Sequence, residues 1–396
     1  MKICELLDSY YPCIDGPINV VKNYSHHLNK KSPCKLAVPK ASKKSGYIDK
    51  EDFEVLRCNS LPAPEKYRNG FPMTDREFLR RIDGADFDIF HAHAPFAMGR
   101  FALKMGKKYK VPVVATMHTQ YKKDFERVLK NCKPLVKIMM KYIMKVYNNA
   151  DSVWTVNNAS CNILREYGYK GKIEVVRNGT DLKYPENPQE LIDKVNCLHN
   201  LDGQKNVFIF IGRIAMYKNL PLIVDALKIL KEMGEDFKMI IVGGGPDETK
   251  LRQLVEEKGL TENFVFAGMI SDRTLIQGYY LRSDLFLFPS TFDTSSLVPI
   301  EAAAHKLPTL LIKDSCTAEN IEDNFNGFLS EENADAYAKR IKEIISTHGL
   351  IEKVGEESHR SVYRSWEKVA EEVREKYQQV IEEYNSKKAL KKRKNK

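Results

Sequence analysis

Short runs of consecutive apolar residues recur along the chain, and stretches with the periodicity of amphipathic helices separate them. The clearest runs are Val207–Ile211 and Leu285–Phe288, and residues 1–7 form a further apolar stretch that Glu5 interrupts. An uninterrupted apolar run is typical of a strand that helices cover on both faces, as in parallel sheets. The pattern therefore predicts an α/β fold in which strands and helices alternate throughout.

The segment 289–304, with the sequence PSTFDTSSLVPIEAAA, combines two carboxylates with the start of a helix. Pro299 suits the first turn of a helix, where its missing N–H group is not needed, and the alanines that follow are good helix formers. Glu301 is therefore expected near a helix N-terminus, with Asp293 in the loop before it.

This loop has the chemistry of a nucleotide-sugar site. Backbone N–H groups of Ser296 and Leu297 can donate to phosphate oxygens. The Glu301 carboxylate can accept from two vicinal ribose hydroxyls, and Asp293 would face another hydroxylated group. The alternative is a solvated turn whose acid complements the helix N-terminus.

Two cations, Arg213 and Lys218, bracket the turn after the run Val207–Ile211. Cations at the carboxyl end of a parallel strand lie where open α/β sheets bind ligands, and they suit a diphosphate. The alternative is that both are ordinary surface charges.

A third predicted strand, residues 237–242, runs into three glycines, which allow close backbone approach. This is not a dinucleotide fingerprint, because a G-x-G-x-x-G motif starting at Gly243 would need glycine where Glu248 stands. An NAD-type dehydrogenase is set aside on this ground.

Eight short motifs follow one another along the chain. The N-terminal motifs read PCIDG, HAHAPF, TMHT and RNGTD, beginning at residues 12, 91, 116 and 177. The C-terminal motifs read FIGRIAMYKN, VGGGP, FAG at residues 266–268, and two acids separated by seven residues. In their order and spacing, these motifs resemble those of the retaining family-4 glycosyltransferases. That family has the GT-B architecture, in which two Rossmann-like domains with parallel sheets face each other across a cleft.

The resemblance implies an acceptor-side domain over residues 1–184 and a nucleotide-sugar-binding domain over residues 205–361. The polar, proline-containing stretch between them predicts the boundary. In this architecture the last helix, expected over residues 362–386, returns to the first domain. Its apolar positions at helical spacing are Trp366, Val369, Val373, Tyr377 and Val380.

By resemblance, Arg213 and Lys218 neutralise the donor diphosphate, and Glu301 binds the ribose. Asp293 stands where the family has a glutamate associated with the donor sugar ring. Because aspartate is one methylene shorter, we expect activity with altered donor geometry. His118 matches the histidine at the mouth of the cleft, where it would face the donor sugar and the acceptor hydroxyl; otherwise it is a core or capping histidine.

Three further positions are assigned to the donor nucleotide by resemblance. Gly16 matches a glycine loop that approaches the donor phosphates, although the next residue, Pro17, lacks an N–H group. Gly244 belongs to the glycines that permit close approach. Met269 lies in segment 267–270, whose backbone would contact the base. The resemblance implies no cofactor beyond this donor.

Two histidines, His91 and His93, are two positions apart at the end of a predicted strand and therefore share one face. We assign His93, nearer the strand exit, to the cleft. A metal site is disfavoured because no acidic third ligand stands at workable spacing. Asp86 and Asp88 offer the D-x-D pattern of metal-dependent glycosyltransferases, but we interpret them as charges at a strand entry. The expected reaction is metal-independent.

The sequences HAPF and MHTQY are most similar to the diacylglycerol-directed members of the family. We predict a retaining enzyme that moves a hexose from a UDP-sugar, such as UDP-glucose, to a membrane lipid or lipid-linked acceptor. Acceptor contacts are expected in residues 60–74, which include Tyr67 and Arg68. The alternatives are a soluble or polysaccharide acceptor, and a catalytically weak nucleotide-sugar-binding homologue.

Retention of configuration has two possible routes. The first is front-face attack with the leaving phosphate accepting the acceptor's proton, which suits a site without an obvious nucleophile. The second is a covalent intermediate on Asp293.

Basic residues are concentrated in two places. Residues 387–396 contribute +7 to the formal net charge of +10, and this tail is predicted to be disordered. It could contact anionic lipid or RNA, or stay solvated, and nucleic acid is the disfavoured partner. In residues 134–147 lysines recur beside apolar residues, which indicates either a helix on an anionic membrane or a surface helix that covers a sheet. The lysines of this stripe are Lys133, Lys137, Lys141 and Lys145.

The composition favours a cytoplasmic protein, at most peripheral on the inner face of the cell membrane. The 396 residues with 43% apolar content suit two domains. Glu5 and Asp8 interrupt the first apolar stretch, so it is not interpreted as a signal peptide, and no run reaches about eighteen apolar residues. Eight scattered cysteines without a C-x-x-C motif suit a reducing compartment.

Overall fold

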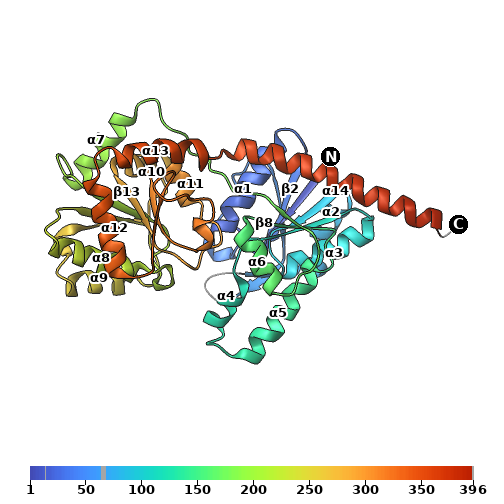
Figure 1. Cartoon of the computed structure of the whole chain (residues 1–396). Coiled ribbons are helices and arrows are strands. Elements are labelled where there is room, and N and C mark those ends of the chain that lie inside the picture. Colours follow the sequence, from blue (N-terminus) through green and yellow to red (C-terminus); the bar gives the residue numbers. More distant parts are fainter. Residues whose placement is uncertain (14, 64–67, 395–396) are drawn as a thin grey trace. The chain divides into compact units, whose positions relative to one another are not determined.

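The computed structural model describes residues 1–13, 15–63 and 68–394, and it divides the chain into two compact units (Figure 1). The first, which we call the N-terminal unit, combines Met1–Asn178 with Trp366–Lys396. The second, which we call the central unit, is the continuous segment Gly179–Ser365. The chain therefore leaves the N-terminal unit and later returns to it.

The N-terminal unit contains a sheet with strand order β3-β2-β1-β6-β7-β8-β9, whose neighbouring strands run parallel. The order reverses direction between β1 and β6, and a separate pair, β4 and β5, is antiparallel. The strands are β1 (Ile3–Leu6), β2 (Cys34–Pro39), β3 (Glu54–Cys58), β4 (Ser60–Pro62), β5 (Arg68–Gly70), β6 (Ile89–Ala92), β7 (Val113–Met117), β8 (Ser152–Thr155) and β9 (Ile173–Val175). The helices are α1 (Gly16–Asn29), α2 (Arg76–Asp83), α3 (Ala97–Tyr109), α4 (Tyr121–Val128), α5 (Lys133–Tyr147), α6 (Asn158–Glu166) and α14 (Trp366–Lys394), with 3₁₀ turns η1 (Lys43–Ser45) and η3 (Pro72–Thr74).

The central unit contains a second parallel sheet, with strand order β12-β11-β10-β13-β14-β15. Here the order reverses between β10 and β13. The strands are β10 (Val207–Ile211), β11 (Lys238–Val242), β12 (Phe264–Gly268), β13 (Leu285–Phe288), β14 (Thr309–Ile312) and β15 (Phe328–Ser330). The helices are α7 (Pro188–His199), α8 (Leu220–Glu232), α9 (Glu248–Glu257), α10 (Arg273–Arg282), α11 (Val298–Ala304), α12 (Ala334–Ser346) and α13 (Leu350–Ser361), with 3₁₀ turns η4 (Met216–Lys218), η5 (Thr261–Asn263) and η6 (Cys316–Ala318).

The apolar runs of the sequence are the buried strands of the two sheets. All side chains of β10 and β13 are buried, and β13 is completely inaccessible to solvent. Helices such as α8 and α12 pack against each other beside the sheet of the central unit. A strand without a solvent face excludes polar side chains, which is why unbroken apolar runs predicted it. The predicted α/β class with two parallel, Rossmann-like sheets is confirmed.

The stretch predicted to separate the two halves contains a helix of the central unit. α7 occupies residues 188–199, begins with Pro188 in its first turn and buries Val195 against α10. Its other positions are mostly polar, and a helix that buries only a narrow face is easily taken for a linker. The boundary between the units instead falls between Asn178 and Gly179.

The prediction of a disordered tail is wrong for residues 387–394. They continue α14, whose N-terminal half buries Trp366, Val373 and Tyr377 in the N-terminal unit. Once packing has fixed these turns, each added residue costs little, and the lysines, leucine and alanine that follow are good helix formers. Residues 395 and 396 lie outside the described part of the chain.

Candidate active site

The predicted donor residues of the central unit lie at the carboxyl ends of β10 and β13, where the strand order reverses. In open parallel sheets this reversal leaves a crevice beyond the strand ends, which is the usual ligand site. Lys218 ends the 3₁₀ turn after β10, and Asp293 lies in the loop after β13. The topology thus brings together two segments that are far apart in the sequence.

Two glycines allow the loop after β11 to pack directly on the turn after β10. Gly243 has a φ of +135°, and a Cβ atom there would lie 2.0 Å from the Gly212 carbonyl oxygen. A Cβ atom at Gly245 would lie 2.1 Å from the Ile214 carbonyl oxygen. Only glycine tolerates such contacts. This packing fixes the backbone of the turn that carries Arg213, whose side chain is exposed.

Lys218 and Asp293 form an ion pair. The Lys218 ammonium donates to both carboxylate oxygens of Asp293 at 2.8 Å, and the Ser290 hydroxyl donates to Oδ2 at 2.5 Å. Both charged side chains are largely shielded from solvent. The sequence assigned them separate roles, on the diphosphate and on the sugar ring. In the structure one cation and one anion neutralise each other.

Glu301, predicted to bind ribose, is buried in α11 and already accepts two hydrogen bonds. Oε1 accepts from Arg273 at 3.1 Å, and Oε2 accepts from the Tyr280 hydroxyl at 2.8 Å. Arg273 also contacts Asp181 at 2.5 Å. Each carboxylate oxygen has a second lone pair, so ribose hydroxyls can still donate to Glu301 while Arg273 and Tyr280 hold it in place.

Sequence reasoning missed Arg273 and Tyr280. Both belong to α10, a helix without a motif of its own, and neither carries a local pattern that indicates a contact with α11. Asp181, in contrast, ends the RNGTD motif, which was noted without a partner.

The other predicted donor residues follow β13 or the strands β11 and β12 of the same sheet. Leu297 immediately precedes α11, and both Leu297 and Ser296 are half-buried. Gly244 and Met269 follow the neighbouring strands β11 and β12, and a Cβ atom on Gly244 would lie 3.9 Å from that of Met269. Met269 is 75% exposed, which leaves its side chain available to a ligand.

Gly16 is the first residue of α1 in the N-terminal unit and is exposed. A Cβ atom there would contact nothing in the described chain within 4 Å, so packing alone does not require glycine. Pro17 lies in the first turn of α1, where the helix does not use the missing N–H group.

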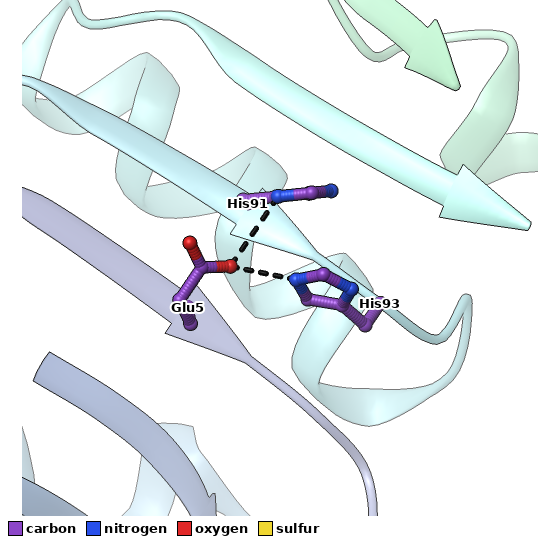
Figure 2. Close-up of side chains that lie close together, drawn as sticks. All are labelled: Glu5, His91 and His93. Carbon is purple, nitrogen blue, oxygen red and sulfur yellow. Dashed lines mark hydrogen bonds and ion pairs between the residues drawn. The ribbon is translucent and has the colours of Figure 1, made fainter. Parts of the chain in front are cut away.

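In the N-terminal unit a buried cluster lies at the other reversal of strand order, between β1 and β6 (Figure 2). The register pairs Glu5 with His91, and His93 follows directly after β6. Glu5 Oε2 lies 2.6 Å from His93 Nε2 and 3.3 Å from His91 Nδ1. His93 Nδ1 in turn lies 2.9 Å from Nε2 of His118, which follows β7 and is 8% exposed.

The opposite side of this cluster contacts α14. The Tyr377 hydroxyl donates to Glu5 Oε1 at 2.7 Å and also contacts His91 Nδ1, while His91 Nε2 lies 2.7 Å from the Thr116 hydroxyl. Burial alone would raise the pKa of Glu5, but His91 and His93 lower it to about 2. Burial, with His93 adding to it, lowers the pKa of His91 to about 4, and burial lowers that of His118 well below its ordinary value.

The two histidines have an acidic neighbour in space, although none stands at workable spacing in the sequence. Glu5 comes from β1, and only strand pairing brings it to His91 and His93. Nevertheless, the distances are those of hydrogen bonds. Two ligands that bind one zinc ion at about 2.0–2.1 Å in tetrahedral geometry lie more than 3 Å apart, whereas Glu5 and His93 are separated by 2.6 Å. The donor set fits a hydrogen-bonded network better than a metal.

Asp86 and Asp88 lie at the amino end of β6, opposite the strand ends that carry the histidines. Asp88 accepts from the Lys2 backbone N–H at 2.7 Å, and Asp86 lies 3.9 Å from the Lys2 ammonium. Their contacts are therefore with the entry of β1.

A cavity of about 270 Å³ lies beyond the carboxyl ends of β1 and β2, in the N-terminal unit. Its lining includes Tyr10, Pro12, Lys40 and Arg68. Lys40 donates to the Asp75 carboxylate at 3.0 Å, and Arg68 donates to the hydroxyl of Ser60 in β4 at 2.8 Å. Arg68 was expected to contact the acceptor; Tyr67 lies outside the described residues.

Two helices of the N-terminal unit, α4 and α5, expose apolar side chains among cations. Val128, Leu135 and Ile138 are 51%, 48% and 60% exposed. The predicted lysines of α5 are exposed, while its other face is buried in the unit. The buried face is that of a surface helix packed on the unit, and contact of the exposed face with a membrane stays a prediction. Among the described residues no helix is long and apolar enough to cross a membrane.

Comparison with known proteins places both units in one family. The model "Glycosyltransferase Family 4" matches residues 15–184, and "Glycosyl transferases group 1" matches residues 171–361. The alpha-monoglucosyldiacylglycerol synthase of Acholeplasma laidlawii is 24% identical over 85% of this chain and 86% of its own length. The enzyme of the same name from Streptococcus pneumoniae is 23% identical over 90% and 82%.

Solved structures show the same fold. Anabaena HepE in complex with UDP aligns with a TM-score of 0.77 and 16% identity over 96% of this chain and all of that chain. The sucrose-phosphate synthase of Thermosynechococcus elongatus aligns with a TM-score of 0.76 and 17% identity over 96% and 99%. The matched families and this shared fold agree with the motifs and the two parallel sheets: the chain belongs to the family-4 glycosyltransferases of the GT-B fold.

Proposed function

We propose that this glycosyltransferase moves a hexose from UDP-glucose, or a similar UDP-sugar, to a membrane lipid with retention of anomeric configuration. The observation that carries the donor site is the placement of Lys218, Asp293 and Glu301 around the strand reversal of the central unit. Relatives named as glucosyldiacylglycerol synthases support a lipid acceptor, and a solved relative with bound UDP supports the nucleotide.

The departure of UDP places negative charge on the diphosphate and positive character on the anomeric carbon. Arg213 and Lys218 are the cations at the donor strand ends, and a charge held in place before the reaction stabilises such a leaving group most effectively. Glu301, fixed by Arg273 and Tyr280, would orient the nucleoside through its ribose. No cofactor or metal is needed for these roles.

Asp293 would stand at the sugar side of the diphosphate, because Lys218 bridges the two positions. In front-face transfer the acceptor hydroxyl loses its proton to the leaving phosphate, and Asp293 would stabilise the cationic sugar. In the covalent route Asp293 would attack the anomeric carbon directly. Its ion pair with Lys218 makes it a weak nucleophile, so we favour front-face transfer.

For the acceptor we propose two contacts in the N-terminal unit. The cavity beside Lys40 and Arg68 is of a size for a headgroup rather than a whole lipid. The exposed apolar residues of α4 and α5, surrounded by lysines, suit the surface of an anionic membrane, where apolar side chains enter the acyl boundary and lysines attract lipid phosphates. We therefore expect the protein to act as a peripheral membrane protein on a cytoplasmic surface.

The decisive experiment measures release of nucleoside diphosphate from UDP- and GDP-sugars, with and without anionic vesicles that contain diacylglycerol, and identifies the product by mass and anomeric configuration. Vesicle-dependent release of UDP with an α-glycosyl lipid supports the proposal. Transfer to a soluble saccharide without vesicles contradicts the lipid acceptor. Tight UDP binding without turnover on any acceptor would favour the weak nucleotide-sugar-binding homologue.

The donor residues are tested by substitution to alanine. We expect Arg213→Ala, Lys218→Ala and Glu301→Ala each to lower kcat/KM at least about tenfold, or ~1.4 kcal/mol of transition-state stabilisation. Lys228→Ala is the matched control, because Lys228 is a partly exposed lysine of α8 whose ion pair within the described residues is with Glu232, one helical turn away. Unchanged kinetics in the three variants would remove these residues from the site.

A further inference from the structure

We propose that Glu5 and His93 are positioning residues that determine which ring nitrogen of His118 carries hydrogen, through a continuous chain of hydrogen bonds from carboxylate to imidazole to imidazole. The chain runs from Glu5 Oε2 to His93 Nε2 at 2.6 Å and from His93 Nδ1 to His118 Nε2 at 2.9 Å. The proposal rests on the proposed function and on the family resemblance, which implies that His118 faces the donor sugar.

The hydrogen positions follow from the donor and acceptor chemistry. An ionised carboxylate only accepts, so His93 Nε2 carries hydrogen and donates to Glu5. The proposal takes His93 as neutral, so that its Nδ1 has a lone pair and accepts a hydrogen bond from His118 Nε2. A neutral His118 is therefore left with its lone pair on Nδ1. Reversing donor and acceptor in the first hydrogen bond reverses them in the second as well. Glu5 therefore sets the tautomer of His118, which is two hydrogen bonds away.

The surroundings fix the donor–acceptor direction of these hydrogen bonds. The low pKa of Glu5 keeps the carboxylate ionised, and burial keeps His118 neutral. The ring edge of Tyr24 packs against His93, and the His93 and His118 rings stack at 5.1 Å. Such packing leaves little freedom to break one bond without disturbing the next.

The competing explanation is that Glu5 and His93 only stabilise the fold. Tyr377, in the same cluster, offers a control that separates the two explanations. Tyr377 donates to the other oxygen of Glu5 and contacts His91, which links α14 to the sheet. This branch does not pass through His93 or His118. Tyr377→Phe therefore removes one hydrogen bond to the same buried carboxylate but leaves the chain to His118 intact.

The test is ¹⁵N NMR of the full-length protein with labelled histidine, which reads the tautomer of each ring without any substrate. We expect wild-type His118 to carry hydrogen on Nε2, and Glu5→Gln to populate the Nδ1–H tautomer. In parallel, kcat should fall at least about tenfold in Glu5→Gln, while the affinity for UDP, which binds residues of the central unit, changes less than about twofold. Tyr377→Phe should keep the His118 signals and retain kcat within about twofold.

Three results would overturn the proposal. The first is an unchanged His118 tautomer in Glu5→Gln. The second is an equal change in Tyr377→Phe, which would indicate general loosening of the cluster. The third is a stoichiometric response of the His91 and His93 signals to Zn²⁺ with gain of activity, which would identify a metal site. If the wild type shows the expected tautomer but transfers no sugar, the proposed function fails while the hydrogen-bond chain stands.

Discussion

At the scale of single residues, the pair of Lys218 and Asp293 determines how the donor site is charged before substrate binds. The ammonium that is expected to receive a diphosphate is already neutralised by a carboxylate at 2.8 Å. A diphosphate that binds as proposed must therefore share or displace this ion pair.

We predict that Asp293→Asn separates binding from catalysis. Without the competing carboxylate, Lys218 is fully available to phosphate, so the affinity for UDP should rise about two- to fivefold, as measured by calorimetry. Turnover should fall at least about tenfold, because the charge beside the anomeric carbon is lost. Asp202→Asn, an exposed position of the central unit, controls for the change in net charge. Weaker binding of UDP in Asp293→Asn would contradict this account.

The sequence predicted the place of a residue where neighbouring sequence indicates its surroundings, and failed where its contacts come from distant segments. Glu301 and Asp293 stand beside a buried strand and a helix start, so the sequence indicated their place. Glu5 was taken only as a charge that interrupts an apolar stretch, because its partners come from other strands and from α14. The contacts of Arg273 with Glu301 likewise join separate helices, which no local pattern reveals.

At the scale of elements, the strands were predictable and the polar helices were not. A strand covered on both faces must be apolar throughout, so β10 and β13 stand out in the sequence. α7 and the end of α14 bury few side chains, and their composition resembles that of linkers and tails. What makes them helical is the packing of Val195 in α7, and of Trp366, Val373 and Tyr377 in the first half of α14, from which the helix propagates.

The N-terminal half of α5 provides a prediction about membrane binding. Leu135→Ser with Ile138→Ser should weaken binding to anionic vesicles at least about tenfold in a flotation assay, because two exposed apolar side chains no longer enter the acyl boundary. Leu198→Ser, which changes an equally exposed leucine of α7, should leave binding unchanged. Loss of binding in both variants would indicate a nonspecific effect, and loss in neither would exclude this surface.

At the scale of the whole molecule, each unit contains a buried neutral histidine that makes the folded state less stable as the pH falls. Burial is the main cause that lowers the pKa of His91 in the N-terminal unit and of His305 in the central unit to about 4, from an ordinary value of 6.5. The unfolded chain binds protons between these pH values and the folded chain does not. Their contribution to stability is therefore complete above pH 6.5 and is lost as the pH falls toward 4.

We predict that the urea midpoint of the N-terminal unit falls steadily from pH 7 to pH 5. The two tryptophans of the chain, Trp154 and Trp366, are both buried in this unit, so their fluorescence reports its unfolding alone. Far-UV circular dichroism reports both units together. Below about pH 4.5 the loss should steepen, because protonation of Glu5, whose folded pKa is about 2, then also favours the unfolded chain. Equal urea midpoints at pH 7 and pH 5 would contradict the lowered pKa of His91 in the folded unit.

The return of the chain to its first unit has a consequence for synthesis on the ribosome. The central unit is contiguous and can fold as soon as it emerges, whereas the N-terminal unit, although made first, lacks α14 until the end. Until Tyr377 arrives, the Glu5 carboxylate misses one of its hydrogen-bond donors. The N-terminal unit, which is translated first, is thus completed only after the central unit, and a released chain that ends at Ser365 would present a protease-resistant central unit and a protease-sensitive N-terminal one.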